Sequence, residues 1–203
     1  MTNLFTTIQT LVPRCHGWCT EGRATALAAA VLTLRPNVTV EIGVWGGRSF
    51  LPMALAHKEI GKGIVIGIDP WSPSESAAGQ DGKNAEWWGS VDHDLVRQDF
   101  FAKIHEFGLG NVIQINRQTS DEFAAHWLAD ITIDLLSLDG NHGEQAYKDA
   151  CNFGPHIRIG GLAFLDDLAW EQGFVRKAEE YLLSHGFIRL YTMDTGAMYQ
   201  RIT

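Results

Sequence analysis

The sequence predicts a single doubly wound α/β domain, with seven mostly parallel strands, helices on both faces and an antiparallel C-terminal hairpin. Short apolar runs alternate with segments of helical periodicity, which is typical of a parallel sheet covered on both faces. The last two runs, Phe187–Thr192 and Ala197–Ile202, are separated only by 193–196, too little chain for a helical crossover, so we expect them to pair antiparallel. The 203 residues, of which 45% are hydrophobic, suit one core, because domains typically have about 100–200 residues.

The first half of the chain contains two expected strands. Thr20 is a suitable N-cap for a helix whose apolar residues recur at helical spacing, and Pro36 ends this helix at Arg35. A strand is then expected at 38–42, followed by a glycine turn at 43–47. A helix at 49–60 and a second strand at 63–68 come next.

The second half continues the alternation after a long connection. Residues 70–92 have few periodic apolar positions and exceed an ordinary loop of up to about 15 residues, so they form either a functional lid or a disordered segment. Thr119 and Glu122 have the spacing of a capping box for a short helix. The other expected elements are helices near 95–107, 144 onward and 173–185, and strands at 112–115, 131–138 and 162–165. We therefore treat 1–203 as one domain with an N-terminal extension at 1–19.

Composition excludes several classes of protein. The net charge of −8 with no basic run disfavours nucleic-acid and anionic-membrane binding, which need clustered cations. No apolar run approaches the roughly 18 residues of a membrane span, and the N-terminal residues do not resemble a secretory signal. The three cysteines suit neither a disulfide scaffold nor a four-ligand zinc site, since Cys15, His16 and Cys19 have no second ligand pair. We expect a reducing cytoplasm.

Ligands of doubly wound sheets bind beyond the carboxyl ends of the strands. Four of the five expected parallel strand ends carry a carboxylate there. Any one of these acids is explained as a helix cap or a solvated loop residue, but their collection at one edge indicates a site. The residues are Glu41 with Gly43, Gly46 and Gly47, then Asp69, Ser120, Asp139 with His142, and Asp166 with Asp167.

The turn after the first strand lets a ligand approach the backbone closely. It is not the dinucleotide pattern G-x-G-x-x-G, because Trp45 stands where the second glycine would be. Asp69, at the end of the second strand, is placed to accept both hydroxyls of a ribose, a device that NAD-binding proteins also use. The residues alone therefore leave the cofactor open.

Four segments together resemble one enzyme family. Glu41–Gly47 resembles the first motif of class I S-adenosylmethionine (SAM)-dependent methyltransferases, which have a Rossmann-like fold, and Ile68–Asp69 resembles their second. Ile133–His142 and Gly160–Asp167 resemble the fourth and fifth strand ends of the metal-dependent O-methyltransferases. That group includes catechol- and caffeoyl-CoA-type enzymes and the sugar O-methyltransferases of macrolide and aminocoumarin biosynthesis. The resemblance extends from about Thr20 to Ile202.

The resemblance implies a cofactor site for SAM. Gly43, Gly46 and Gly47 would surround the methionine part, and Glu41 would support the loop and the amino group. Asp69 would hold the ribose hydroxyls. Ser120 would lie beside the adenine base. Trp71 would cover the adenine or the ribose face.

The resemblance also implies a metal site. Asp139, Asp166 and Asp167 would be the ligands, with His142 where catechol-type enzymes have a lysine base. The pair Asp166–Asp167 is closer to the sugar-modifying branch, since catechol-type enzymes usually have Asn as the third ligand. Carboxylate oxygens suit Mg²⁺ or another hard divalent ion, which lowers the pKa of a bound hydroxyl. His142 is interpreted either as the general base or as a loop histidine that binds backbone.

The leading hypothesis is therefore Mg²⁺-dependent O-methylation of a small polyhydroxylated acceptor, a sugar or a catechol-like diol. The alternatives are an NAD-linked oxidoreductase and a SAM-binding module without catalysis. Trp71, Trp87 and Trp88 in the long connection form either a wall of the acceptor site or the connection's own packing. A homodimer is the default expectation.

Overall fold

The computed structural model describes residues 3–80, 82–126 and 131–203. Residues 1–2 of the expected N-terminal extension and residue 81 of the expected lid lie outside this part of the chain. The helices are α1 (Leu4–Leu11), η1 (Val12–Arg14), α2 (Glu21–Leu34), α3 (Phe50–Ile60), α4 (Pro73–Ala77), α5 (Gly82–Ser90), α6 (His93–Glu106), α7 (Ser120–Ala125), α8 (Glu144–Phe153), η2 (Gly154–His156) and α9 (Phe174–Ser184). The strands are β1 (Val38–Ile42), β2 (Ile64–Ile68), β3 (Ile113–Asn116), β4 (Ile133–Leu138), β5 (Ile157–Leu165), β6 (Phe187–Met193) and β7 (Gly196–Arg201).

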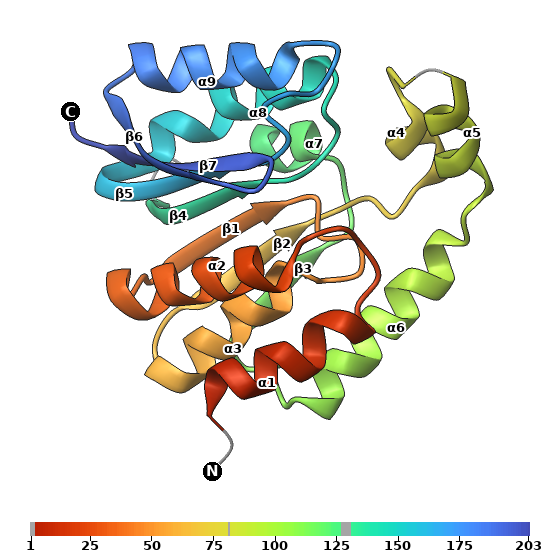
Figure 1. Ribbon diagram of the computed structural model, residues 1–203, viewed down its shortest axis with the longest axis vertical. Coiled ribbons are helices and arrows are strands. Elements are labelled where there is room, and N and C mark those ends of the chain that lie inside the picture. The colour runs from red at the N-terminus through yellow and green to blue at the C-terminus, as the bar shows by residue number, and fades with distance from the viewer. Residues whose placement is uncertain (1–2, 81, 127–130) are drawn as a thin grey trace.

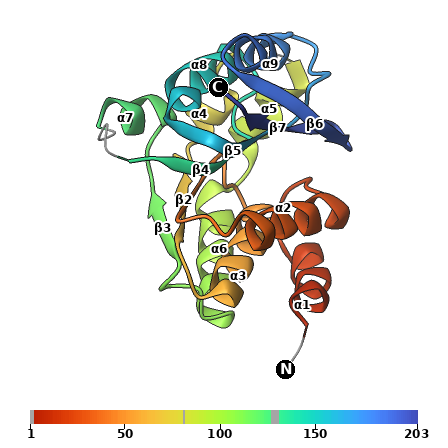
Figure 2. The ribbon, with the colours of Figure 1, turned by 90° about the vertical axis from the view of Figure 1, so that its left-hand side faces the viewer.

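The strands form one seven-stranded sheet in the order β3-β2-β1-β4-β5-β7-β6. The strands from β3 to β5 are parallel, and β7 pairs antiparallel with both β5 and β6. This confirms the predicted fold class and the C-terminal hairpin. Figure 2 shows the twist of the sheet from β3 at one edge to β6 at the other.

Helices cover both faces of the sheet (Figure 1). On one face, α1, α2, α3 and α6 enclose a core that includes Leu27, Phe50 and Phe100. On the other, α8 and α9 enclose a core that includes Phe153 and Leu182. Because both faces of the sheet are buried, the sequences of the central strands are nearly continuous runs of apolar residues.

Local signals explain most helix boundaries. The Thr20 side chain accepts a hydrogen bond from Arg23 N at 3.1 Å and begins α2, as predicted. Arg35 ends this helix in the left-handed conformation, just before Pro36. Thr119 and Glu122 form the predicted capping box at α7.

Two parts of the chain contain helices that the sequence analysis did not predict. The N-terminal extension contains α1, which buries Ile8 and Leu11. The expected lid is not disordered but folds into α4 and α5, neither of which has a buried residue. These short helices project to one side of the sheet in Figure 1, above the end where the parallel strands finish. None of the described helices is long and apolar enough to cross a membrane.

Candidate active site

The strand register brings the predicted site residues together. Ile42, Leu138 and Leu165 lie side by side as the last residues of β1, β4 and β5. The ladder continues one residue further, since Asp139 N donates to Ile42 O at 2.9 Å and Asp166 N donates to Leu138 O at 3.0 Å. Each strand is therefore followed, at the same level of the sheet, by one of the residues that the sequence singled out.

A cavity of about 930 Å³ lies over these strand ends. Such a volume is at the upper end of the roughly 300–1,000 Å³ usual for ligand sites. Segments that line it come from the N-terminal part, the β1–α3 loop, the α4–α5 segment and the loops after β4 and β5. The predicted site residues that line it are Gly43, Asp69, Ser120, Asp139, His142, Asp166 and Asp167.

The three glycines after β1 form one tight turn, but only Gly43 lines the cavity. Gly43 has φ of 86°, and a Cβ atom there would lie 2.2 Å from Asp139 O. A Cβ at Gly46 would meet His16 O at 2.5 Å, and one at Gly47 would meet the Phe100 ring at 2.5 Å. Gly46 and Gly47 are thus required for packing of the turn against the N-terminal segment and α6.

Glu41 is completely buried just before this turn. Ser137 Oγ donates to its Oε1 at 3.2 Å, while Oε2 has no partner among the described residues. Burial raises the pKa of Glu41 to about 8, although the hydroxyls of Ser49 and Ser137 oppose this shift. A buried carboxyl oxygen without a donor is an acceptor available to a ligand or to a proton.

Asp69 lines the cavity with its carboxylate held by backbone amides. Trp45 N donates to Oδ2 at 2.8 Å, and Trp71 N donates to Oδ1 at 2.7 Å. Burial raises the pKa of Asp69, and these amide donors counteract the shift. Both oxygens retain lone pairs that can accept further donors.

Trp71 does not have the predicted position over a cofactor. Its side chain is 1% exposed, its Nε1 donates to Trp45 O at 2.9 Å, and its ring stacks on Phe100. Burial of this large ring in the core stabilises the turn after β2. The sequence interpretation failed because a tryptophan after a strand end has the same local pattern whether it faces the core or the ligand.

Ser120 is the first residue of α7 and is buried at the cavity wall. Gln145 Nε2 donates to its Oγ at 3.1 Å. Ser120 therefore lies beyond the end of β3, on the same edge of the sheet as Asp69.

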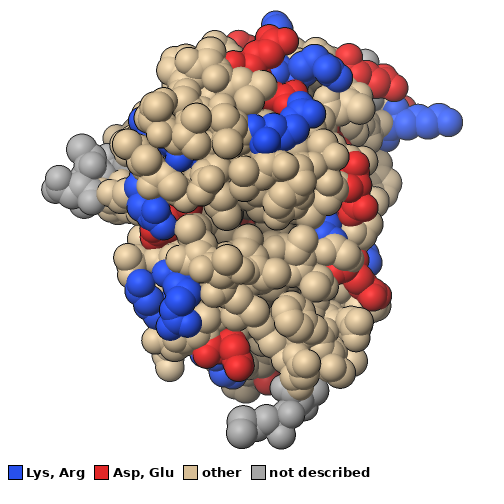
Figure 3. Space-filling view, turned by 60° about the vertical axis from the view of Figure 1, so that its left-hand side comes forward, with Lys and Arg blue, Asp and Glu red and all other residues tan. Residues whose placement is uncertain are grey.

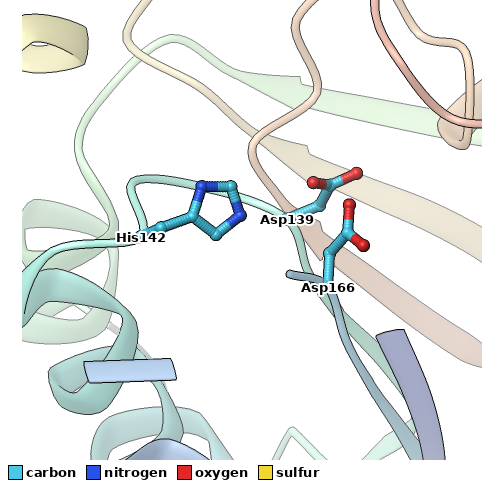
Figure 4. Close-up of side chains that lie close together, drawn as sticks. All are labelled: Asp139, His142 and Asp166. Atoms are coloured by element: carbon cyan, nitrogen blue, oxygen red, sulfur yellow. The ribbon is translucent and has the colours of Figure 1, made fainter. Parts of the chain in front are cut away.

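Asp139, His142 and Asp166 form a compact cluster, with one potential ligand atom from each within 4.8 Å of the others. Figure 4 shows the imidazole and the Asp166 carboxylate directed toward Asp139, from the loops after β4 and β5. Asp167, the third predicted ligand, lies outside this group of three. Its Oδ2 is 3.7 Å from His142 Nε2, and its backbone has φ of 49°.

Burial and mutual repulsion control the charges of the cluster. Burial and the neighbouring Asp166 raise the pKa of Asp139 well above its usual range. Burial also lowers the pKa of His142, although Asp167 and Asp166 oppose the shift. The lowered pKa favours the neutral imidazole, and its buried Nε2 has no hydrogen-bond partner in the described part of the chain.

Arg23 is a site residue that the sequence interpretation missed. Its guanidinium forms a buried ion pair with Asp166 and also donates to Thr195 Oγ at 3.3 Å. Arg23 lies one turn before Leu27 and two turns before Val31, on the buried face of α2. A charged residue in the apolar stripe of a helix was the signal available, since an unpaired charge is rarely buried.

Tryptophan rings from three segments meet at the mouth of the cavity. Trp18 lies 5.2 Å from Trp87 between ring centroids, and Trp45 lies 5.0 Å from Trp88. The α4–α5 segment is tied on its other side by Asn141, whose Nδ2 donates to Ala78 O at 2.6 Å. This segment therefore spans the cavity from the tryptophans to the loop after β4.

Charges are mixed on the face of the molecule shown in Figure 3. Basic and acidic side chains are interspersed there, and uncharged surface predominates. This face therefore presents no continuous basic surface.

Comparisons with known proteins find solved structures of similar fold. The O-methyltransferase TomG from Streptomyces achromogenes, solved with SAM, is similar over 100% of this chain and 91% of its own, at 12% identity and a TM-score of 0.68. The Bacillus cereus O-methyltransferase, solved with S-adenosylhomocysteine (SAH), matches 100% of this chain and 92% of its own, at 10% identity and a TM-score of 0.65. The O-methyltransferase NovP matches 92% of this chain and 84% of its own, at 16% identity and a TM-score of 0.66. No curated protein matches the sequence.

These structural likenesses establish the fold, which alone does not decide function. The sequence adds a family assignment, because a family model described as a methyltransferase domain matches residues 40–168. That range begins within β1 and ends just after Asp166 and Asp167, so it includes the strand-end residues of the site. The chain therefore belongs to the methyltransferase domain family.

Proposed function

We propose that the protein transfers a methyl group from SAM to a hydroxyl of a small molecule, with a divalent cation at the acid cluster. The observation that carries the proposal is the opening of the glycine turn, Asp69 and the cluster of Asp139, His142 and Asp166 into one cavity. The similar O-methyltransferases support the choice of acceptor atom.

The residues fit SAM. Gly43 lines the cavity, and because it has no side chain the turn packs directly against Asp139 in the loop after β4. The unpartnered Glu41 Oε2 supplies an acceptor for an ammonium group, and Asp69 accepts hydroxyl donors. When bound, SAM supplies a methyl group on a sulfonium.

The residues also fit a divalent ion. Asp139 and Asp166 each offer a carboxylate oxygen, and these atoms and a His142 nitrogen lie within 4.8 Å of one another. Carboxylate oxygens are the ligands that Mg²⁺ prefers in proteins. A bound divalent ion would lower the pKa of the acceptor hydroxyl.

The chain's own side chains then complete the site. We assign Asp139, Asp166 and Asp167 as the residues that hold the ion, and the neutral His142 as the proton acceptor at Nε2. Asp167, 3.7 Å from Nε2, would favour the imidazolium that forms. General-base assistance of this kind contributes about 10²–10⁴ in rate. The α4–α5 segment would act as the lid over the acceptor.

Calorimetric titration of the metal-free protein with SAH, with and without Mg²⁺, tests the cofactor. We expect micromolar affinity, equivalent to about −8 kcal/mol, and a separate heat for Mg²⁺. Asp139→Asn is expected to remove the Mg²⁺ heat and turnover while it retains SAH binding. If SAH does not bind in either condition, the methyltransferase proposal fails, and nicotinamide cofactors become the next ligands to test.

A second pair of variants identifies the third ligand. Asp167→Asn is expected to weaken Mg²⁺ binding, whereas His142→Gln leaves Mg²⁺ affinity unchanged and lowers turnover. The opposite pattern would make His142 the ligand, in keeping with the tighter geometry of the observed cluster, and would remove it from the role of base. The cytoplasmic location and the homodimer remain predictions.

A further inference from the structure

The acceptor side of the cavity has an excess of negative charge. Six carboxylates line it on the side of the α4–α5 segment and the loops after β4, β5 and β6: Glu75, Asp139, Glu144, Asp166, Asp167 and Asp194. The cations that line the cavity within the described residues are Arg23, Arg48 and Lys148, apart from the histidines. Arg23 pairs with Asp166, so the excess of negative charge rests mainly on Glu75, Glu144, Asp167 and Asp194.

The three cations already contact groups of the protein. Arg23 is buried in its ion pair with Asp166. Arg48 directly follows the glycine turn, where its Nη1 donates to Gly17 O at 2.7 Å and its buried Nε has no partner among the described residues. Lys148 lies 4.0 Å from Glu144. An acceptor that carries a carboxylate or phosphate would therefore enter the cavity against uncompensated like charge.

Aromatic rings line the same part of the cavity. The Trp18 and Trp87 side chains are 65% and 41% exposed at its mouth, although their rings contact one another. Deeper in the site, the Trp170 ring centroid lies 5.1 Å from that of His142, beside the acid cluster. Exposed aromatic surface around a cavity is typical of a binding site, and such rings favour flat or cationic ligands.

The α4–α5 segment encloses the region between these rings. Asn141 Nδ2 binds Ala78 O, and Gln172 Nε2 donates to Gly79 O at 2.9 Å, so the loops after β4 and β5 both hold it. An acceptor beneath it loses water, which strengthens the effect of the surrounding carboxylates on its charge.

We propose that the acceptor is a ring compound that is cationic or uncharged, and that anionic acceptors such as phosphorylated, carboxylated or coenzyme A-linked molecules are rejected. This inference rests on the proposed function, because it concerns the acceptor of that methyl transfer. The tryptophans contact the ring, and the acceptor-side carboxylates set the order of affinity by charge.

Three catechols of similar size test the charge order: dopamine, which is cationic, 4-methylcatechol, which is neutral, and 3,4-dihydroxyphenylacetate, which is anionic. Their affinities are measured by calorimetry on the full chain with SAH and Mg²⁺. We expect dopamine to bind tightest and the acid weakest, with about tenfold between successive probes, because a nearby charge pair changes a binding constant by about that factor. High salt should reduce the differences in affinity between the three probes, because it screens the charges.

Matched variants separate the charge effect from the ring effect. The double variant Glu75→Gln and Glu144→Gln should narrow the gap between dopamine and the acid, whereas Glu180→Gln, exposed on α9, should not. Trp87→Leu should weaken all three probes to a similar extent. Phe101→Leu, which removes an exposed ring outside the cavity, should leave all three affinities unchanged.

Equal affinities, tightest binding of the acid, or no binding of any probe would overturn the inference. The SAH titration in the same samples reports separately on the proposed function. If SAH binds and the charge order is absent, only the acceptor inference fails. If SAH does not bind, the proposed function fails, and the same probes titrated without cofactor still determine whether the cavity has this preference.

Discussion

The cofactor side and the acceptor side of the cavity are built in different ways. On the cofactor side, backbone groups fix the geometry: the β-ladder continues into the turn, and amide donors from Trp45 and Trp71 hold Asp69. On the acceptor side, the ladder also fixes the backbone of Asp139 and Asp166, but the side chains and the α4–α5 segment are held by side-chain contacts, namely the buried pair of Arg23 and Asp166 and the tie from Asn141. The first arrangement is as rigid as the sheet, whereas the second is sensitive to single substitutions that change charge.

Loss of Arg23 should have the largest effect and should fall on the acceptor side. Arg23→Met leaves the Asp166 carboxylate buried without its partner, which we expect to lower the free energy of unfolding by about 3–5 kcal/mol. Thermal unfolding of the variant with and without Mg²⁺ measures this loss. Mg²⁺ should raise the Tm of the variant more than that of the wild type, because the ion replaces the missing positive charge.

Arg23→Met combined with Asp166→Asn serves as the control for this prediction. The double variant should recover most of the lost stability without metal, since it has no unpaired charge. If it is as unstable as the single variant, Arg23 acts through packing and the ion pair does not support the acceptor side.

Gly43→Ala should have the next largest effect and should act on the cofactor side. The added Cβ would overlap Asp139 O, and we expect a loss of about 3 kcal/mol in stability together with loss of SAH binding. Gly61→Ala is the matched control, because Gly61 also has positive φ but nothing lies within 4 Å of its Cβ position. Its expected cost is only about 1 kcal/mol, from backbone strain. Equal losses in the two variants would show that contact with Asp139 does not constrain the turn.

Glu41 should give an effect that depends on pH. The folded-state pKa of about 8 exceeds the unfolded value of about 4.3, so the folded protein binds the extra proton. Stability from this group is complete below about pH 4 and falls as the pH rises toward 8, by at most about 1.4 kcal/mol per pH unit.

Thermal unfolding of wild type and Glu41→Gln between pH 5 and pH 9 measures the contribution of Glu41. The Tm of the wild type should fall more steeply across this range. If the ammonium group of SAH pairs with Glu41 Oε2, SAH should reduce the difference in slope between the Tm curves of the wild type and Glu41→Gln. Parallel Tm curves without SAH would show that Glu41 is not the titrating group.

Regular patterns made the strand-end acids predictable. Asp69, Asp139 and Asp166 each follow an apolar run, and the rule for parallel sheets places such residues at one edge. β5 begins at Ile157, five residues earlier than predicted, because Arg158, Gly160 and Gly161 interrupt its apolar pattern.

Other features depend on contacts between distant segments. The orientation of Trp71 toward Phe100, and the meeting of Trp18 with Trp87, result from packing between segments far apart in the sequence. The helices α4 and α5 bury no residue of their own, so their sequences contain no periodic apolar pattern that would predict a helix. By contrast, α1 does have apolar residues at helical spacing, with Leu4, Ile8 and Leu11, and could have been recognised.

The attachment of the α4–α5 segment has a consequence for the rate at which ligands exchange. Asn141 and Gln172 hold it by side-chain bonds to Ala78 O and Gly79 O, and a typical bond of this kind contributes about 0.5–1.5 kcal/mol. Two such bonds together contribute about 1–3 kcal/mol, which corresponds to an open population of about 0.6–15%, close to the range of minor states that proteins sample without unfolding. Ligands can therefore enter and leave through this minority state while the sheet beneath stays intact.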